Sequence, residues 1–209
     1  HNTPQLLFLG AGRTAVSVSL GASHTCAILD DGSLKCWGTN IYGQLGTGSF
    51  IISNIPQLVD LGVGRTAVSV SLGDEHTCAT LDDGSLKCWG SNSNGRLGIG
   101  STTNHNTPQL LFLGAGRTAV SVSLGGWHTC AILDDGSLKC WGYNGFGQLG
   151  IGTLTDYTTP RLVDLGVGRT AVSVSLGGYT NGAHTCAILD DGSLKCWGYN
   201  NYGQLGIDQ

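Results

Sequence analysis

Short runs in which apolar residues alternate with small polar ones recur along the whole chain. The first run, Ala15 to Leu20, has the period of two that predicts a β-strand. A second run, His24 to Leu29, and a third, Ser33 to Trp37, flank Asp30-Asp31-Gly32, whose residue types favour a hairpin turn. A fourth run, Pro56 to Leu61, begins with proline, which is tolerated at the start of a strand. The pattern therefore predicts four short strands in each unit of the sequence, and no helix.

The segment that begins at His24 returns almost letter for letter three more times. Its copies begin at His76, His128 and His184, at intervals of 52, 52 and 56 residues. Four short strands in a repeat of about this length are typical of a propeller blade. We expect an all-β fold, a β-propeller-type array of four four-stranded antiparallel blades that forms a single repeat domain, residues 1–209. The approximate bounds of the blades are 10–61, 62–113, 114–165 and 166–209, with residues 4–9 as an additional strand.

Each predicted blade repeats the same core residues. Val16, Val18 and Leu20 give the first strand one apolar face. The tryptophan of the third strand is the largest apolar side chain of the repeat, and its burial stabilises a fold by roughly 2–3 kcal/mol. The histidine at the start of the second strand is interpreted as a hydrogen-bonding structural residue. The expected structural residues are Trp37, Trp89, Trp141 and Trp197, and His24, His76, His128 and His184.

Eight cysteines, two in each repeat, indicate the compartment. A three-residue turn places Cys26 opposite Cys36, where Cβ atoms are about 4.5–5.5 Å apart or closer, near the separation that a disulfide needs. Because disulfides persist outside the cytosol, we expect a secreted, extracellular protein, and we interpret the start at His1 as that of a processed chain or of the ordered piece of a longer one. Eight buried free thiols are the alternative. The expected disulfides are Cys26–Cys36, Cys78–Cys88, Cys130–Cys140 and Cys186–Cys196.

The residues shared by the four copies resemble the repeat of the regulator of chromosome condensation family. The shared string is His-Thr-Cys-Ala-x-Leu-x-Asp-Gly-Ser-Leu-Lys-Cys-Trp-Gly-x-Asn-x-x-Gly-Gln-Leu-Gly, at 24–46, 76–98, 128–150 and 184–206, with Arg96 replacing glutamine in the second copy. The resemblance implies four-stranded antiparallel blades, and the paired cysteines look like the version found in secreted bacterial proteins. It also implies that about seven blades normally close a ring. The founding member is a nuclear exchange factor for a small GTPase, but this chain has no acidic insertion or basic tail of the kind that such an exchanger uses.

Composition and spacing exclude several other classes of function. The net charge is -4, the lysines are not clustered, and no apolar stretch approaches 18 residues, so we expect neither a nucleic-acid partner nor a membrane span. One histidine and two cysteines per repeat do not have the spacing of a zinc site. Asp30 and Asp31 are turn formers before they are calcium ligands or catalytic carboxylates, and Glu75 is the only glutamate. We expect no enzymatic activity, no metal and no cofactor.

Loops that differ between the copies carry the candidate ligand-binding residues. In a propeller these loops cover the faces of the array, where exposed aromatic rings bind sugar rings or protein surfaces. Sequence drift in surface loops is the alternative explanation of the same residues. The candidates are Trp127, Tyr143, Phe146, Tyr179, Tyr199 and Tyr202.

The two ends of the chain carry the most specific expectation. A strand of the fourth type, Pro4, Gln5, Leu6, Leu7, Phe8 and Leu9, comes before any blade, and the last repeat ends at Gln209 without such a strand. Residues 4–9 would complete the last blade in cis, closing a ring, or in trans, in another copy of the chain. The hypothesis is a non-enzymatic extracellular scaffold protein that self-associates head to tail into a fibre. A closed monomeric propeller that binds carbohydrate or protein is the alternative.

Overall fold

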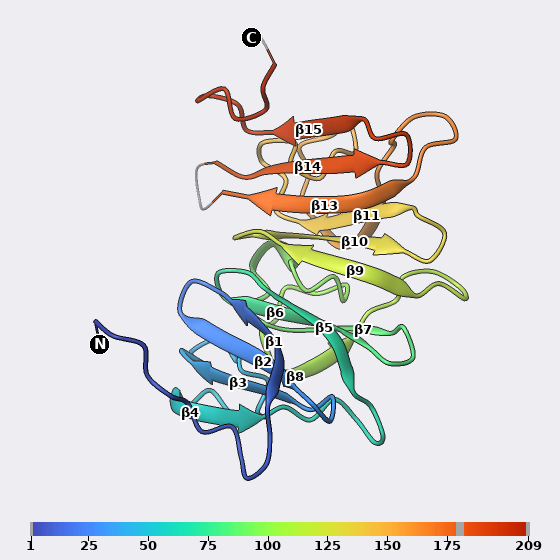
Figure 1. Cartoon of the computed structure of the whole chain (residues 1–209). Helices are drawn as coiled ribbons and strands as arrows, with labels where there is room; N and C mark the ends of the chain where they lie inside the picture. The colour runs from blue at the N-terminus through green and yellow to red at the C-terminus, as the bar shows by residue number, and fades with distance from the viewer. Residues whose placement is uncertain (1, 179–181, 208–209) are drawn as a thin grey trace.

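The computed structural model describes residues 2–178 and 182–207 and consists of four antiparallel sheets that follow one another along the chain (Figure 1). Blade 1 contains β1 (Ala15–Leu20), β2 (His24–Leu29), β3 (Leu34–Gly38) and β4 (Ser53–Leu58). Blade 2 contains β5 (Ala67–Leu72), β6 (His76–Leu81), β7 (Leu86–Gly90) and β8 (His105–Leu110). Blade 3 contains β9 (Ala119–Leu124), β10 (His128–Leu133), β11 (Leu138–Gly142) and β12 (Tyr157–Leu162). Blade 4 contains three strands, β13 (Ala171–Gly177), β14 (His184–Leu189) and β15 (Leu194–Gly198).

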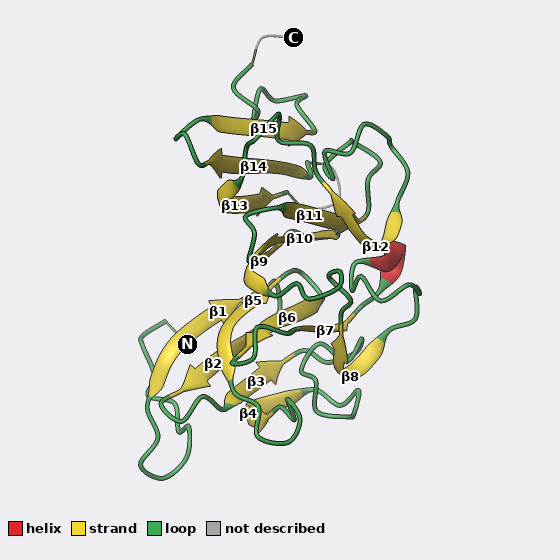
Figure 2. Ribbon diagram, turned by 90° about the vertical axis from the view of Figure 1, so that its right-hand side faces the viewer, coloured by secondary structure: helices red, strands yellow, loops and turns green. Residues whose placement is uncertain are grey.

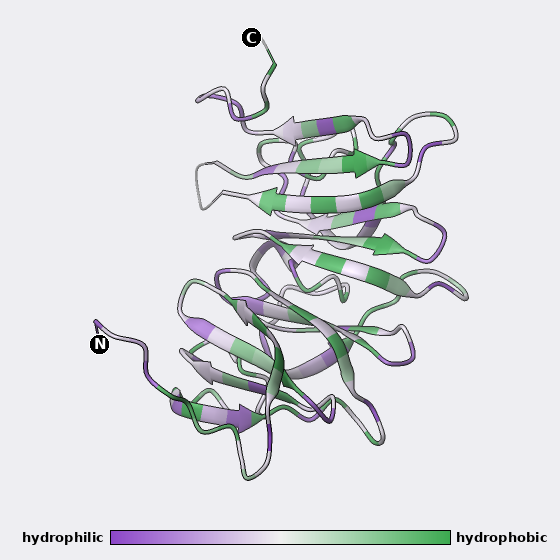
Figure 3. Ribbon diagram, in the orientation of Figure 1, coloured by the Kyte–Doolittle hydropathy of each residue, from purple (hydrophilic) through white to green (hydrophobic). Residues whose placement is uncertain are grey.

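The apolar core lies between the blades. The first strands of neighbouring blades contact one another, and β4, β8 and β12 lie on the outside of the array (Figure 2). Ile28 and Leu34 of blade 1 pack in one cluster with Leu72 and Trp89 of blade 2, and equivalent clusters lie at the next two joins. Figure 3 shows apolar residues alternating with more polar ones along β9 and β13. Each core is therefore built half from one blade and half from the next.

The second and third strands of each blade are joined by a disulfide, as predicted. Cys26 lies opposite Cys36 in the ladder of β2 and β3, and the turn between these strands contains Gly32 with a φ of 77°. No free cysteine occurs among the described residues. The four bonds are Cys26–Cys36, Cys78–Cys88, Cys130–Cys140 and Cys186–Cys196.

Two details of the strands differ from the prediction, and bulges explain both. The outer strand β4 begins at Ser53 rather than at Pro56, and a bulge beside the proline removes the need for an N–H in the ladder. A second bulge lies in the first strand, and in blade 2 it leaves Val68, the equivalent of Val16, 66% exposed whereas Leu72, the equivalent of Leu20, is 7% exposed, so these two positions do not share a face. The first strand of every blade repeats this irregularity.

Helical structure is confined to a single turn within the described parts of the chain. This is a 3-10 turn, η1 (Ser93–Gly95), in which Asn94 has a left-handed backbone with a φ of 59° (Figure 2). No helix in residues 2–178 and 182–207 is long and apolar enough to cross a bilayer.

The array is open, and residues 4–9 form no strand. The sheet of blade 4 ends at β15, which pairs with no fourth strand among the described residues. Pro4 to Leu9 lie beside blade 1, at the end of the array opposite to the last described residues (Figure 1). The closure in cis is therefore not formed, because β15, the one third strand without an outer partner among the described strands, lies at the far end of the array.

Candidate functional site

Neighbouring blades are joined by a repeated set of three hydrogen bonds. At the first join, Thr77 Oγ1 and the indole N–H of Trp89 both donate to the carbonyl oxygen of Gln44 at 2.9 Å. His24 Nε2 lies 2.8 Å from the same threonine hydroxyl. The other two joins use His76, Thr129, Trp141 and the Arg96 carbonyl, and His128, Thr185, Trp197 and the Gln148 carbonyl.

The histidines of this set are neutral at pH 7. The threonine hydroxyl already donates to a carbonyl oxygen, so it accepts from Nε2 of the imidazole, and Nδ1 carries no proton. Burial lowers the pKa of His24 from 6.5 to about 4 and the pKa of His128 to about 3. Burial also holds the pKa of His76 well below 6.5.

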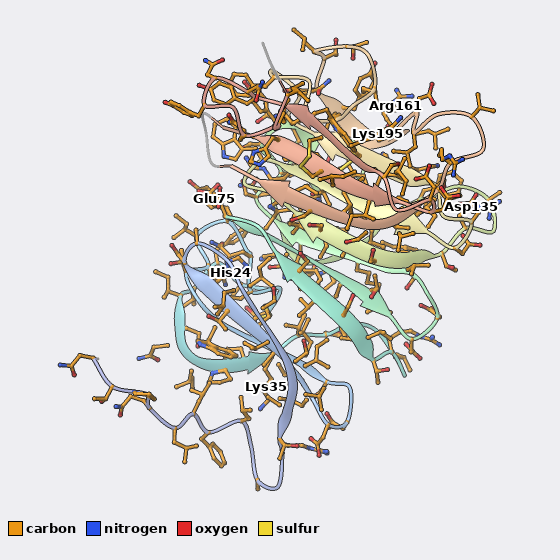
Figure 4. The ribbon with its side chains drawn as sticks, turned by 45° about the horizontal axis from the view of Figure 1, so that its top comes forward. His24, Lys35, Glu75, Asp135, Arg161 and Lys195 are labelled. Atoms are coloured by element: carbon orange, nitrogen blue, oxygen red, sulfur yellow. A yellow bond between two sulfur atoms is a disulfide. The ribbon has the colours of Figure 1, made fainter. Side chains whose placement is uncertain are left out.

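A lysine in the third strand of each blade fixes the segment that enters that blade. Lys87 Nζ donates to the carbonyl oxygen of Leu61 at 2.9 Å, and Leu61 follows β4, the outer strand of the preceding blade. Lys35 makes the equivalent bond to the carbonyl oxygen of Leu9 at 2.8 Å. Figure 4 labels Lys35 in blade 1 and Lys195 in blade 4, at opposite ends of the array. Residues 4–9 therefore lead into blade 1 from the place where, at the internal joins, the outer strand of the preceding blade ends.

The open side of blade 1 carries unpaired members of the joining set. Neither the Thr25 hydroxyl nor the Trp37 indole N–H has a hydrogen-bond partner among the described residues, although their equivalents donate at all three internal joins. Leu20 is 70% exposed, whereas Leu72 in blade 2 is 7% exposed. Trp37, which was expected in a core, is only half-buried, because no described blade covers this side of blade 1. This surface, the leading face, consists of Ala15, Val18, Leu20, Thr25 and Trp37.

The open side of blade 4 lacks the contacts that blades 1, 2 and 3 make with the blade that follows each of them. Leu194 is 65% exposed, whereas its equivalent Leu138 is fully buried. A Cβ at Gly98 would lie 2.6 Å from the indole nitrogen of Trp141 in the next blade, but Gly206 has nothing within 4 Å of its Cβ position. A groove of about 380 Å³ lies beside the unpaired edge of β15. This surface, the trailing face, consists of His184, Ile188, Leu194, Gly203 and Gly206.

Five of the six candidate ligand residues form a continuous row of rings across blades 3 and 4. Successive ring centroids are 5.4, 5.9, 4.9 and 6.0 Å apart and the rings meet edge to face. Tyr202, at the blade 4 end, is 84% exposed and the other four rings are half-buried. Tyr179 lies outside the described residues. This aromatic ladder consists of Trp127, Tyr143, Phe146, Tyr199 and Tyr202.

Family models identify the repeat. A model described as the regulator of chromosome condensation (RCC1) repeat matches residues 15–44, 67–96, 119–148 and 171–204, and a second model with that description matches residues 31–80 and 83–132. The chain belongs to the RCC1 repeat family. In the first model, each RCC1 match begins with the first strand of a blade and ends after its third strand.

The chain is similar to several curated proteins and solved structures. The ultraviolet-B receptor UVR8 of Arabidopsis thaliana is 34% identical over 190 residues, which cover 91% of this chain and 42% of the receptor. Human E3 ubiquitin-protein ligase HERC2 is 30% identical over 191 residues, 90% of this chain and 4% of the ligase. Human WBSCR16 has a TM-score of 0.81 at 24% identity, over 99% of this chain and 52% of that chain. Prp20p from Saccharomyces cerevisiae has a TM-score of 0.74 at 24% identity, over 93% of this chain and 46% of that chain. The chain therefore spans about half of these relatives or less, and the solved structures establish its fold.

One RCC1 blade departs from the repeat at Arg96, which is buried. Arg96 Nη1 donates to the carbonyl oxygen of Gly126 at 3.1 Å and lies 3.7 Å from the carboxylate of Glu75. The guanidinium lies 5.6 Å from the centre of the Trp127 ring. Glu75, labelled in Figure 4, thus pairs with Arg96 of its own blade, and Arg96 makes the contact with blade 3. Burial raises the pKa of the neighbouring Asp74.

The aspartates of each RCC1 hairpin turn hold the turn itself. Ser33 donates its hydroxyl and its backbone N–H to Asp31, and these bonds lower the pKa of that carboxyl group. Arg13 lies 2.9 Å from Asp31 and 3.6 Å from Asp30. Within residues 2–178 and 182–207, no three His, Cys, Asp or Glu side chains are grouped as metal ligands.

Sequence reasoning missed most of the residues that join the RCC1 blades. Threonine follows histidine, and lysine precedes the second cysteine, in all four copies. This invariance within the chain is a usable signal for Thr25 and Lys35. It does not reveal that these side chains point to a neighbouring blade or to the segment that enters their own.

Proposed function

We propose that this protein is a non-enzymatic extracellular structural protein that associates head to tail. The trailing face of one copy lies against the leading face of the next. The observation that carries this proposal is that each face exposes apolar residues whose equivalents, at the internal joins, pack against the equivalents of the other face. Leu194 on one face and Leu20 on the other are exposed only where the array ends. Apolar burial of this kind is the main driving force of association.

The polar groups of the two faces match in the same way. In a join built like the internal ones, Thr25 and Trp37 donate to the carbonyl oxygen of Gln204 in the preceding copy. His184 of that copy holds the position from which His24, His76 and His128 contact a threonine hydroxyl at the internal joins, and its Nδ1 donates to the carbonyl oxygen of Gly182 in the single chain. Because buried polar groups need hydrogen-bond partners, this set fixes the orientation of the two copies.

Residues 4–9 supply the outer strand that blade 4 lacks. In blade 2, Leu110 lies opposite Lys87 and Gln109 lies opposite Cys88. The same register places Leu6 opposite Lys195 of the other copy. Such strand addition contributes main-chain hydrogen bonds, and a head-to-tail contact continues into a filament unless its rotation closes a ring.

The four disulfides support an extracellular location, because such bonds persist in oxidising compartments. The likeness of the paired cysteines to those of secreted bacterial repeats supports the same location. Self-association is the partnership that this proposal requires, and it involves no nucleic acid and no membrane span.

Size-exclusion chromatography with light scattering tests the proposal. The whole chain should elute with a mass well above the 21.6 kDa of one copy, and a chain without residues 2–9 should elute as one copy. Leu7→Asp should act like the deletion, because its equivalent Leu111, directly after β8, is buried in the core. Leu6→Asp is the control, since its equivalent Leu110 is exposed even there. A single species of 21.6 kDa for the whole chain would contradict the proposal.

The aromatic ladder favours a second candidate function, a monomeric propeller module that binds carbohydrate or protein. Aromatic rings provide large contact areas, and Tyr202 leaves one end of the ladder open. Titration with oligosaccharides, followed by tryptophan fluorescence, should then give a saturable change that Trp127→Ala removes. An unchanged spectrum together with a high mass would exclude this candidate in favour of the first.

A further inference from the structure

An apolar loop distinguishes blade 1 from the other blades. Phe50, Ile51 and Ile52, between β3 and β4, are all more than half exposed. The equivalent residues of blade 2 are Thr102, Thr103 and Asn104, and those of blade 3 are Leu154, Thr155 and Asp156. Three consecutive exposed apolar residues are unusual on a soluble surface and indicate an interaction site.

The internal joins show what this loop contacts. At the join of blades 2 and 3, Asn94 Nδ2 donates to Asp156 Oδ2 at 2.7 Å. Gly95, beside Asn94, presses against Thr158, where a Cβ would lie 2.5 Å from the backbone. The last residue of the three-residue loop segment therefore faces the blade that precedes it.

The same relation pairs the two ends of the chain. Tyr202 in blade 4 is the equivalent of Asn94, and Ile52 in blade 1 is the equivalent of Asp156. Tyr202 is 84% exposed and Ile52 is 58% exposed. A join between copies would thus bring Tyr202 against Ile52, an apolar contact, where the join of blades 2 and 3 has the polar pair of Asn94 and Asp156.

We infer that the segment Phe50–Ile52 is the docking surface for Tyr202 of a preceding copy. The inference rests on the proposed head-to-tail association. At the internal join of blades 1 and 2 the equivalent residues are Tyr42 and Asn104.

Sedimentation equilibrium of full-length variants tests the inference. Ile52→Asp should weaken association about tenfold or more, because it places a charge against an apolar ring. Tyr202→Asn combined with Ile52→Asp rebuilds the pair of Asn94 and Asp156 and should restore association. Leu154→Asp, in the exposed loop of blade 3, is the control and should have no effect. The thermal midpoint of each monomer should equal that of the parent chain.

The outcomes separate this inference from the proposed function. If the parent chain associates and loses association on removal of residues 2–9, but Ile52→Asp has no effect, then the docking surface is wrong and the head-to-tail proposal stands. Failure of the double variant to restore association would also overturn the inference. A parent chain that remains monomeric overturns both.

Discussion

Residues 2–20 and 106–124 have the same sequence but different structures. In the second segment the first residues belong to β8 and Leu111 is 5% exposed. In the first segment the same residues form no strand and Leu7 is 41% exposed. Identical sequences have identical intrinsic propensities, so the difference comes from β7, which pairs with β8, whereas no described strand pairs with residues 4–9. In this fold an outer strand therefore forms only where the third strand of a blade is present to pair with it.

The same comparison extends from the strand to the face of the blade. Leu20 and Leu124 occupy equivalent positions in identical strands, and they are 70% and 8% exposed. Only Leu124 has a preceding blade against which to pack. The two ends of the array are therefore halves of a core that the internal joins contain whole.

The largest expected effect is on the free energy of unfolding, and it should separate Leu111 from Leu7, which occupy equivalent positions in the two identical segments. Leu111→Ala should lower the free energy of unfolding by about 2–5 kcal/mol, because it leaves a cavity in a packed core. Leu7→Ala should cost less than about 1 kcal/mol in the single chain, because the side chain is partly in water already. Urea unfolding at concentrations where the chain is monomeric measures both. Equal losses would mean that residues 2–9 are packed like β8 without a second copy.

Acid should weaken the complete joins. A buried histidine whose pKa falls from 6.5 to about 4, such as His24, binds fewer protons when folded than when unfolded. Stability is therefore full above pH 6.5 and declines as the pH falls to about 4, by up to about 1.4 kcal/mol per pH unit for this group. Unfolding midpoints between pH 7 and pH 4 measure the slope.

A matched pair of variants isolates the contribution of His24. His24→Gln removes one of the three buried histidines with a lowered pKa, so it should make the decline between pH 6.5 and pH 4 less steep while His76 and His128 still contribute to it. His105→Gln, on the outer strand β8 and outside the joining set, should leave the decline unchanged. An identical slope in His24→Gln and the parent chain would contradict the assignment.

A smaller effect should separate two glycines with the same backbone conformation. Gly206 on the trailing face and Gly116 in the loop before β9 both have a φ of 68°, which asparagine tolerates, and nothing lies within 4 Å of either Cβ position. Gly206→Asn should weaken association about tenfold, because its equivalents press against a tryptophan of the next blade. Gly116→Asn should leave association unchanged. Light scattering across a dilution series compares them, and equal effects would show that the trailing face is not a contact.

The sequence predicts what is local to one blade and misses what lies between blades. Alternation and the Asp-Asp-Gly turn are local signals, and they give β1, β2 and the opposed cysteines in the correct register. The position of Val16 was wrong because a bulge changes the period, and the start of β4 was wrong because proline is tolerated beside a bulge. The leading and trailing faces depend on which side chains cross to the next blade. The repeated residues alone do not show which side chains point toward the neighbouring blade.

The smallest expected effect concerns the order in which the disulfides are reduced. Cys186 and Cys196 face the open side of blade 4 and are half-buried, whereas the other six cysteines are fully buried between blades. Because a reductant must reach a sulfur atom to attack it, Cys186–Cys196 should be reduced several-fold faster than the other bonds. Limited reduction, alkylation and mass spectrometry of peptides identify the first bond to open. Head-to-tail association covers this face, so the advantage should disappear in associated material and remain in Leu7→Asp. Preferential reduction of a bond in blade 1, 2 or 3 would show that the trailing face is already covered in the single chain.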